Sequence, residues 1–274
     1  MKKYLLPLLK NDYKNLFNYL IKSKNKVSEI EYFNFRFKKK TFLGKKGDVL
    51  RIPLDTIITP YVLKNGSWDE YIINFVKKKT QDKNYIFLDI GANIGLISRQ
   101  LINSNIKINQ FLCFEPQENN YKLLKYNLKY YKNIYCYNFG LGTKNIKRKL
   151  YKNKLNFGDF SFIKKTSNYE SSRIIDANQF LKKELPKRLP LIYKSDTQGM
   201  DEEILLHLEG NILKRIEILI LEISNHELLK KNKYKFLRIL DNFKCFEIKG
   251  KAITKIEILN KINKEHEFDL MISK

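Results

Sequence analysis

From residue 85 onward, short apolar runs alternate with segments in which apolar residues recur at helical spacing. Continuous apolar runs are typical of parallel strands that helices cover on both faces. Repeated strand–helix units of this kind predict an α/β fold with a doubly wound, mostly parallel sheet. The predicted strands, seven in all, are 85–90, 110–115, 134–139, 191–196, 218–223, 245–248 and 268–272.

The segments between these strands have the periodicity of helices. The pattern predicts helices over 68–79, 95–104 and 177–184, and helices with apolar faces at 121–131, 204–212 and 236–243. Ser67 and Glu70 have the spacing of a capping box, with Ser67 as the N-cap. Trp68 falls on the apolar stripe of the helix that follows, which favours a place in the core over contact with a ligand.

The first 65 residues have a different pattern. Residues 1–25 carry apolar side chains at helical spacing, and between 30 and 53 aromatic residues alternate with polar ones. These patterns predict a helix and a β-hairpin, closed by an Asn-Gly turn at 65–66. We therefore expect a small helix/hairpin extension, 1–65, and a main domain, 66–274.

Composition adds a strong positive charge: 53 Lys and Arg against 29 Asp and Glu give a net charge of +24. Such a charge suits nucleic acid, an acidic glycan or the surface of an anionic membrane. The lysines are spread along the whole chain beside abundant Asn and Ile, a composition that an AT-rich coding bias also produces. The charge alone therefore selects no partner.

The three cysteines, Cys113, Cys136 and Cys245, are scattered, and their number and surroundings predict reduced thiols. No apolar run approaches the ~20 residues that cross a bilayer. Lys10 and Asp12 cut the N-terminal apolar segment too short for a signal peptide. These features together predict a cytoplasmic protein.

The first strand of the main domain ends in an acid, Asp89, and a glycine-bracketed turn from Gly91 to Gly95. Glu115 stands 20 residues after Gly95, where a carboxylate can accept hydrogen bonds from both hydroxyls of a ribose. A dinucleotide turn has a middle glycine that admits a pyrophosphate, but this chain has Asn93 there. The nearby acid favours a cationic group. We infer S-adenosylmethionine, which carries a sulfonium, an amine and a ribose.

Several segments resemble the FkbM-type methyltransferases, which are class I S-adenosylmethionine-dependent enzymes. They are LDIGANIG (88–95), FEPQENNYKLLKYNL (114–128), YNFGLG (137–142), LPLIYKSDTQGMDEEILLHLEG (189–210) and IEILILEIS (216–224). The resemblance covers about residues 66–224 and implies a Rossmann-like methyltransferase sheet and O-methylation of a sugar or natural product. One departure is Met200-Asp201, where the family has Ala-Glu.

The resemblance also implies roles for individual residues. The implied cofactor-binding residues are Asp89, Gly91, Asn93, Gly95 and Glu115, and those at the reaction end are Lys194, Asp196 and Gln198. Ligands in doubly wound sheets lie beyond the carboxyl ends of the strands. Because of their places in the turn or at strand ends, we add Ala92, Pro116, Asn138 and Gln198 to the cofactor-binding set.

Methyl transfer to a hydroxyl gains from a general base, and Asp196 is the candidate. Asp196 can instead hold the cofactor amine or cap a helix. Lys194 can stabilise a developing alkoxide or pair with Glu222, and His226 can be an alternative base or a surface residue. Asp196, Glu222 and Asp201 could hold a divalent ion, but we expect no metal.

The expected function is therefore S-adenosylmethionine-dependent O-methylation of a sugar, a glycan or a related small molecule. A nucleic-acid methyltransferase is one rival, although the Ser-Asp-Thr-Gln-Gly segment at 195–199 differs from the Asn/Asp-Pro-Pro-aromatic loop of exocyclic-amine methylation. The other rivals are an NAD-dependent oxidoreductase and a non-catalytic binding protein with this fold. The acceptor would be selected by 1–65 and by 140–188, where one further strand is predicted near 148–151.

Overall fold

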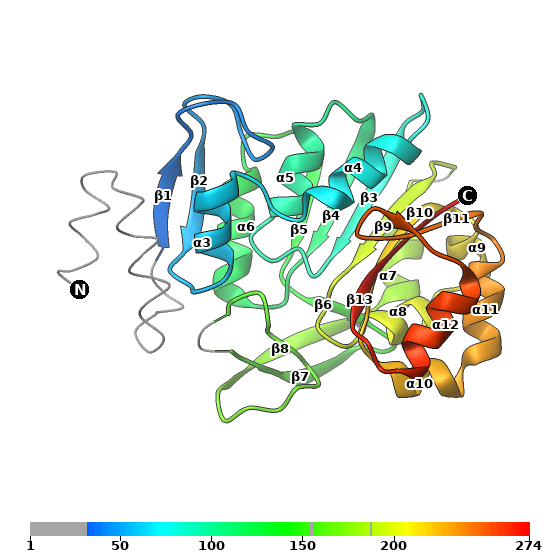
Figure 1. Ribbon diagram of the computed structural model, residues 1–274. Coiled ribbons are helices and arrows are strands. Elements are labelled where there is room, and N and C mark those ends of the chain that lie inside the picture. Colours follow the sequence, from blue (N-terminus) through cyan, green and yellow to red (C-terminus); the bar gives the residue numbers. More distant parts are fainter. Residues whose placement is uncertain (1–31, 154–155, 187) are drawn as a thin grey trace.

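The computed structural model describes residues 32–153, 156–186 and 188–274 (Figure 1). The predicted helix within 1–25 lies outside these residues. An eight-stranded sheet in the order β12-β11-β13-β10-β9-β3-β4-β5 forms the centre of the fold. Its strands are β3 (Tyr85–Ile90), β4 (Ile108–Phe114), β5 (Ile134–Tyr137), β9 (Leu191–Ser195), β10 (Ile216–Ile223), β11 (Cys245–Ile248), β12 (Lys251–Ala252) and β13 (Phe268–Ser273).

Five of these strands, β5, β4, β3, β9 and β10, run parallel to one another. In sequence, β3 is the first of these parallel strands. The next two, β4 and β5, lie on one side of it, and β9 and β10 lie on the other side. The strand order thus reverses between β3 and β9, as in a doubly wound Rossmann-like sheet. The predicted fold class is confirmed. The sheet has eight strands instead of seven because the two-residue β12 adds to β11 at the edge.

Helices cover both faces of the sheet, and successive residues of a strand point to opposite faces. Phe87 of β3 packs in one core with residues of α4 (Glu70–Lys79), α5 (Leu96–Ile102) and α6 (Glu118–Leu128). Leu88 packs in the other core. The helices that contribute to this second core are α7 (Ala177–Glu184), α8 (Asp201–His207), α9 (Gly210–Leu213), α10 (His226–Lys231), α11 (Lys233–Leu240) and α12 (Lys255–Asn263).

The predicted hairpin is confirmed as an antiparallel pair, β1 (Tyr32–Arg36) and β2 (Val49–Pro53). It is followed by a helix that was not predicted, α3 (Ile58–Asn65). The carboxylate of Asp55 accepts hydrogen bonds from the backbone N–H groups of Ile58 and Thr59, at 3.2 and 2.8 Å. This acid, three residues before the helix, is the sequence signal that marks the start of α3.

The section 140–188 contains a separate three-stranded sheet. Its strands are β6 (Gly140–Gly142), β8 (Tyr169–Asp176) and β7 (Ile146–Tyr151), in that order. The strand predicted near 148–151 and the helix predicted over 177–184 are confirmed as β7 and α7. This small sheet lies against the central one, because Leu141 and Leu150 belong to the same core as Leu88 (Figure 1).

The predicted N-cap of α4 is wrong. Asp69, not Ser67, precedes the helix, and Asp69 has a left-handed backbone with φ of 42°. The hydroxyl of Ser67 donates a hydrogen bond to the carboxylate of Glu70 instead of accepting one from the helix. The residues of the expected capping box therefore contact each other without capping α4.

The helix predicted at 204–212 is interrupted. The side chain of Asn178 in α7 donates to the carbonyl oxygen of His207 and accepts from the N–H of Glu209, both at 2.8 Å. These two bonds satisfy the backbone where α8 ends, so α9 starts as a separate turn. An interaction across 29–31 residues of sequence thus overrides the apolar period.

Within the described part of the chain, Cys113, Cys136 and Cys245 are all free thiols, as predicted. No helix among the described residues combines the length and the apolar character needed to cross a membrane.

Candidate active site

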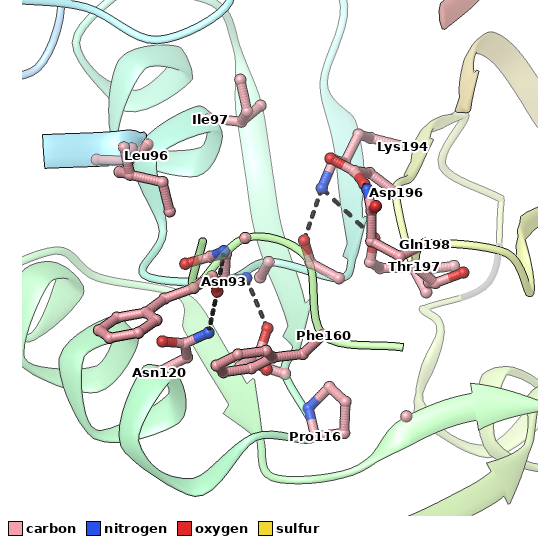
Figure 2. A pocket seen from close by; sticks show the side chains of 18 of the residues that line it. Asn93, Leu96, Ile97, Pro116, Asn120, Phe160, Lys194, Asp196, Thr197 and Gln198 are labelled. Carbon is pink, nitrogen blue, oxygen red and sulfur yellow. Dashed lines mark hydrogen bonds between the residues drawn. The ribbon is translucent and has the colours of Figure 1, made fainter. Parts of the chain in front are cut away.

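A cavity opens at the carboxyl ends of β3, β4 and β9, at the point where the strand order reverses (Figure 2). Of the residues that the sequence singled out, the cavity is lined by Gly91, Ala92, Asn93, Glu115, Pro116, Lys194, Asp196 and Gln198. Asp89, Gly95, Asn138 and His226 are not in its wall. The structure therefore brings most of the predicted site together and assigns other places to these four residues.

The glycine turn is held against the end of β9. Gly91 has φ of 73°, and a Cβ atom there would lie 1.8 Å from the carbonyl oxygen of Asp196. The N–H groups of Gly91 and Ala92 both donate to the carbonyl oxygen of Phe114, at 3.0 and 2.9 Å. Position 91 must therefore be glycine for the turn to approach β9 this closely.

Gly95 has a packing role and does not line the cavity. It is the N-cap of α5 with φ of 85°, and a Cβ atom there would meet the Cδ1 atom of Leu124 at 2.8 Å. The missing side chain lets α5 lie close to α6. Gly95 thus supports the turn through helix packing, and its contact with a cofactor stays a prediction.

Asp89 is fully buried behind the turn and does not reach the cavity. Its carboxylate accepts a hydrogen bond from Ser98 Oγ at 2.6 Å and forms an ion pair with Lys194 Nζ at 3.1 Å. The contacts of Asp89 are thus made with the protein, and its direct contact with a cofactor stays a prediction. Asp89 positions Lys194.

Lys194 fastens the turn to the sheet. Its Nζ atom donates to the carbonyl oxygen of Gly91 at 2.7 Å, in addition to its ion pair with Asp89. Burial alone would lower the pKa of Lys194, but attraction to Asp89 and Asp196 outweighs it and raises the pKa above its ordinary value. The predicted alternative, an ion pair with Glu222, is not formed.

Glu115 presents its carboxylate at the cavity wall with 6% of the residue exposed. Its two oxygens accept hydrogen bonds from the backbone N–H groups of Asn93 and Gln117, each at 2.8 Å. Burial raises the pKa of Glu115 to about 7, although these two bonds oppose the rise. A carboxylate oxygen has more than one lone pair, so Glu115 can still accept bonds from ligand hydroxyls.

Asn138 supports the same strand end from outside the cavity. Its Nδ2 atom donates to the carbonyl oxygens of Glu115 and Pro116, at 3.1 and 3.4 Å. The predicted direct contact between Asn138 and a cofactor is therefore not supported. Its contacts fix the backbone that carries Glu115.

Aromatic side chains from the segment between β7 and β8 form an apolar wall, to which the sequence assigned no binding role. Phe157, Phe160 and Phe162 all line the cavity. The carbonyl oxygen of Phe157 accepts hydrogen bonds from the Nδ2 atoms of Asn93 and Asn120, at 3.2 and 2.9 Å (Figure 2). These bonds tie the segment to the glycine turn and to α6. The aromatic Gly-Asp-Phe-Ser stretch at 158–161 was the available signal.

Asp196 and Gln198 face the cavity from the segment after β9 (Figure 2). Gln198 Nε2 donates to Asp196 Oδ1 at 2.9 Å and to the two oxygens of Glu222 at 3.0 and 3.2 Å. Gln198 thereby holds Asp196 and Glu222 near each other. Burial, and then repulsion from Asp196, Asp201 and Asp269, raise the pKa of Glu222 to about 9. Asp196 is the acid of this group that lines the cavity.

Asp201 holds the same segment together. Its carboxylate accepts hydrogen bonds from Ser195 Oγ at 2.5 Å and from the N–H groups of Thr197 and Gly199 at 2.9 and 3.3 Å. This use of the side chain explains how an aspartate can stand where the resemblance implies a glutamate. No group of three or more His, Cys, Asp or Glu in the described ranges is placed to hold a metal ion.

His226 lies at the start of α10 and is 7% exposed. Neither ring nitrogen has a hydrogen-bond partner among the described residues. Burial lowers the pKa of His226. The residue is outside the cavity wall, so the structure does not support its predicted role as an alternative base.

Trp68 and Asp69 line the cavity from the start of α4. Trp68 is only partly buried, so the prediction that it belongs to the core alone is incomplete. It packs on the core of Phe87 and on a further apolar cluster of the hairpin and α3, and it also borders the cavity. The sequence did not single out Asp69 as a site residue. In the sequence, Asp69 lies inside the apparent capping box of Ser67 and Glu70, which gave it no separate role.

The sheet and the cavity define an α/β protein with a cavity at the switch point of a doubly wound sheet. Comparison of the sequence with family models and with curated proteins gives no match. The structure is similar to that of methyltransferase FkbM from Methylobacillus flagellatus KT, with 15% identity, 78% of this chain and 52% of that chain covered, and a TM-score of 0.46. This chain thus spans about half of that protein.

Two further solved structures are similar over most of their length. One is a Streptococcus mutans protein in complex with SAH, with 17% identity, 75% of this chain and 96% of that chain covered, and a TM-score of 0.41. The other is an rRNA methylase from Streptococcus thermophilus, with 15% identity, 73% and 92% covered, and a TM-score of 0.40.

Proposed function

We propose that this protein is an S-adenosylmethionine-dependent methyltransferase that methylates a hydroxyl of a sugar or a related small molecule. The observation that carries the proposal is that Glu115, the turn at Gly91 and Asp196 all face one cavity. Glu115 would accept hydrogen bonds from the ribose hydroxyls. The apolar wall, with Phe157 and Phe162, suits a nucleobase, which has two π-faces.

The middle glycine of a dinucleotide turn is replaced by Asn93, whose side chain donates to the carbonyl oxygen of Phe157 at 3.2 Å. The Asn93 side chain and its hydrogen bond within the chain therefore fill the space that a dinucleotide site leaves open for a pyrophosphate. The nearby cavity acids, Asp69 and Asp196, favour a cationic ligand over a pyrophosphate. These contacts favour S-adenosylmethionine over NAD.

When bound, S-adenosylmethionine would supply an activated methyl group on a positive sulfur. Transfer of this methyl group to the acceptor oxygen would leave S-adenosylhomocysteine as the second product. Asp196 would take the proton of the acceptor hydroxyl. Lys194, bound to Asp89 and Gly91, keeps the segment that carries Asp196 against the turn.

The test uses Asp196→Asn in a methyl-transfer assay with radiolabelled cofactor and glycan extracts. A general base predicts a kcat lower by about 10²- to 10⁴-fold with little change in affinity for S-adenosylhomocysteine. The surface-exposed Asp241→Asn is the control. An unchanged kcat would contradict the role of Asp196 as general base. In a separate experiment, mass spectrometry of glycans from cells with and without the gene would identify the class of glycan that is methylated.

A second candidate acceptor is single-stranded RNA, because one face of β7 and β8 is basic and aromatic. Lys147 lies directly opposite Arg173, and Lys149 Nζ lies 4.0 Å from the ring centroid of Tyr169, which is 48% exposed. Like charges opposite each other in a ladder are unfavourable, so phosphate groups would relieve them. Exposed aromatic rings can stack on bases.

The RNA candidate is tested by fluorescence anisotropy with a labelled single-stranded RNA. Binding that weakens with salt and is reduced about tenfold or more in Lys147→Ala/Arg173→Ala supports it. Lys251→Ala, on the exposed edge strand β12, is the control. If the protein bound no RNA, or if Lys251→Ala lost as much RNA affinity as the double variant, the RNA candidate would be rejected and the sugar acceptor retained.

A further inference from the structure

Asp69 occupies the N-cap position of α4 but does not cap the helix. An aspartate at this position normally accepts a hydrogen bond from an N–H group of the first turn. Asp69 has φ of 42° and ψ of 53°, and its side chain accepts no such bond. The common structural reason for an acid at the start of a helix is therefore absent.

The Asp69 side chain lies in the wall of the cavity, next to Trp68. In the described part of the chain, no hydrogen bond or ion pair to its carboxylate is formed. Its charged neighbours are Asp269, Asp196, Lys194 and Lys249. Burial first, and then the two acids, raise the pKa of Asp69 to about 6. A positive ligand group would stabilise this carboxylate in its charged form.

The two lysines near Asp69 do not neutralise it. Lys194 is bound to Asp89 and to the carbonyl oxygen of Gly91. Lys249 forms no ion pair with Asp69 among the described contacts. The acid has therefore kept its capacity to bind a cation from outside the protein.

Asp89, the acid that the sequence suggested for a cationic cofactor group, does not line the cavity. It is fully buried and is bound to Lys194 and Ser98. Asp69 lines the cavity at the side of α4, together with Ile72, while Glu115 lines it at the end of β4. The cavity thus has Glu115 for the ribose hydroxyls and two further acids, Asp69 and Asp196. Asp196 accepts a hydrogen bond from Gln198 Nε2 at 2.9 Å, whereas Asp69 is the acid left available for a cation.

We propose that the Asp69 carboxylate binds the ammonium group of the methionine part of S-adenosylmethionine. This inference rests on the proposed function, because it assigns a residue to one group of that cofactor. The left-handed backbone at position 69 accompanies a carboxylate that makes no cap bond and is left available to the ligand. Asp69 is a specificity residue for the cofactor and takes no part in the transfer itself.

The experiment compares two ligands by calorimetry: S-adenosylhomocysteine, which has the ammonium group, and 5′-methylthioadenosine, which lacks the amino-acid part. Asp69→Asn is the test variant, because asparagine accepts a left-handed backbone as readily as aspartate. We expect its affinity for S-adenosylhomocysteine to fall by about 10- to 100-fold, as for loss of a charged hydrogen bond, with little change for 5′-methylthioadenosine.

Two further variants complete the design. Asp69→Gly also permits the positive φ and should give the same selective loss. Asp82→Asn, an exposed acid paired with Lys107, is the control and should bind both ligands as the wild type does. Unchanged affinity of Asp69→Asn for S-adenosylhomocysteine would overturn the inference, as would an equal loss for both ligands. Failure of the wild type to bind either ligand would instead refute the proposed function.

Discussion

A side chain at position 91 would collide with the chain at the end of β9, and this makes Gly91 a sensitive position of the site. Two costs are combined there: a positive φ of 73° and a Cβ atom 1.8 Å from the carbonyl oxygen of Asp196. The first cost is about 1–2 kcal/mol for a residue other than glycine. The second forces the turn away from β9, where Asp196 begins the loop that lines the cavity.

We therefore expect Gly91→Ala to lower the free energy of unfolding by more than about 2 kcal/mol and to abolish binding of S-adenosylhomocysteine. Gly250→Ala is a matched control, because Gly250 has φ of 81° and nothing within 4 Å of the added Cβ atom. Urea unfolding should show only the backbone cost of about 1–2 kcal/mol for the control. Equal losses in the two variants would contradict the close contact of Gly91 with Asp196.

The raised pKa of Glu222 makes the stability of the folded protein depend on pH. Burial, and then repulsion from Asp196, Asp201 and Asp269, raise this pKa to about 9, from an ordinary value of 4.5. Between these values the folded protein holds a proton that the unfolded chain releases, so this contribution to stability is lost as pH rises toward 9. Glu222→Gln stays neutral, and its melting temperature should fall less than that of the wild type between about pH 6 and about pH 9.

The exposed Glu227→Gln is the control for that comparison. Its melting temperature should follow that of the wild type across the pH range. If Glu222→Gln and the wild type lost stability in parallel, Glu222 would not carry the proton.

At the scale of elements, α6 connects the N-terminal hairpin to the site through one side chain. Asn127 Oδ1 accepts from the N–H of Arg51 at 2.7 Å, and Nδ2 donates to the carbonyl oxygens of Arg51 and Ile94, both at 2.9 Å. Ile94 belongs to the glycine turn. The hairpin, α6 and the turn are therefore joined by three bonds to a buried residue.

Asn127→Ala leaves these backbone groups without their partner, and we expect a loss of about 2–4 kcal/mol of unfolding free energy. Asn242→Ala is the control, because the Asn242 amide makes only local bonds at an exposed helix end, to Arg238 and Ile239. Chemical denaturation should show a change within about 0.5 kcal/mol for the control. A similarly small change for Asn127→Ala would show that α6 and the hairpin are held by apolar packing alone.

The sequence predicted elements well where a local pattern decided them. The continuous apolar runs that became β3, β9 and β10 are buried on both faces, so their composition and their position in the sheet agree. The sequence-based prediction failed where residues distant in the sequence determine where an element begins or ends. Asn178, for example, ends α8 from another helix, 29–31 residues away in the sequence. The capping box of α12, Thr254 with Glu257, was a local signal that was overlooked.

The same distinction holds for the candidate site. Glu115 and Asn93 could be predicted because their spacing follows the strand–turn–helix unit that carries them. Asp89 was assigned to a ligand because its place at the end of β3 is visible in the sequence, while its burial beside Lys194 is not. Asp69 was missed because only the folded chain shows that it does not cap α4.

At the scale of the whole molecule, a chain with a net charge of +24 has three acids, Asp69, Glu115 and Asp196, in the wall of its cavity. The small sheet of β6, β8 and β7 lies beside that cavity, and its exposed strand β7 carries Lys147, Arg148 and Lys149. That sheet was not predicted because β6 pairs with β8 across more than 30 residues. The fold thus places the basic strand β7 and a cavity lined by acids next to each other.

The central claim is that this cavity binds S-adenosylmethionine through Glu115, and calorimetry with S-adenosylhomocysteine tests it most directly. The account predicts one site per chain in the wild type, no binding of NAD, and an affinity lower by about 10- to 100-fold in Glu115→Gln. Glu118→Gln, three residues along at the exposed start of α6, should bind as the wild type does. A wild-type protein that binds no S-adenosylhomocysteine, or a Glu115→Gln variant that binds it equally well, would contradict the account.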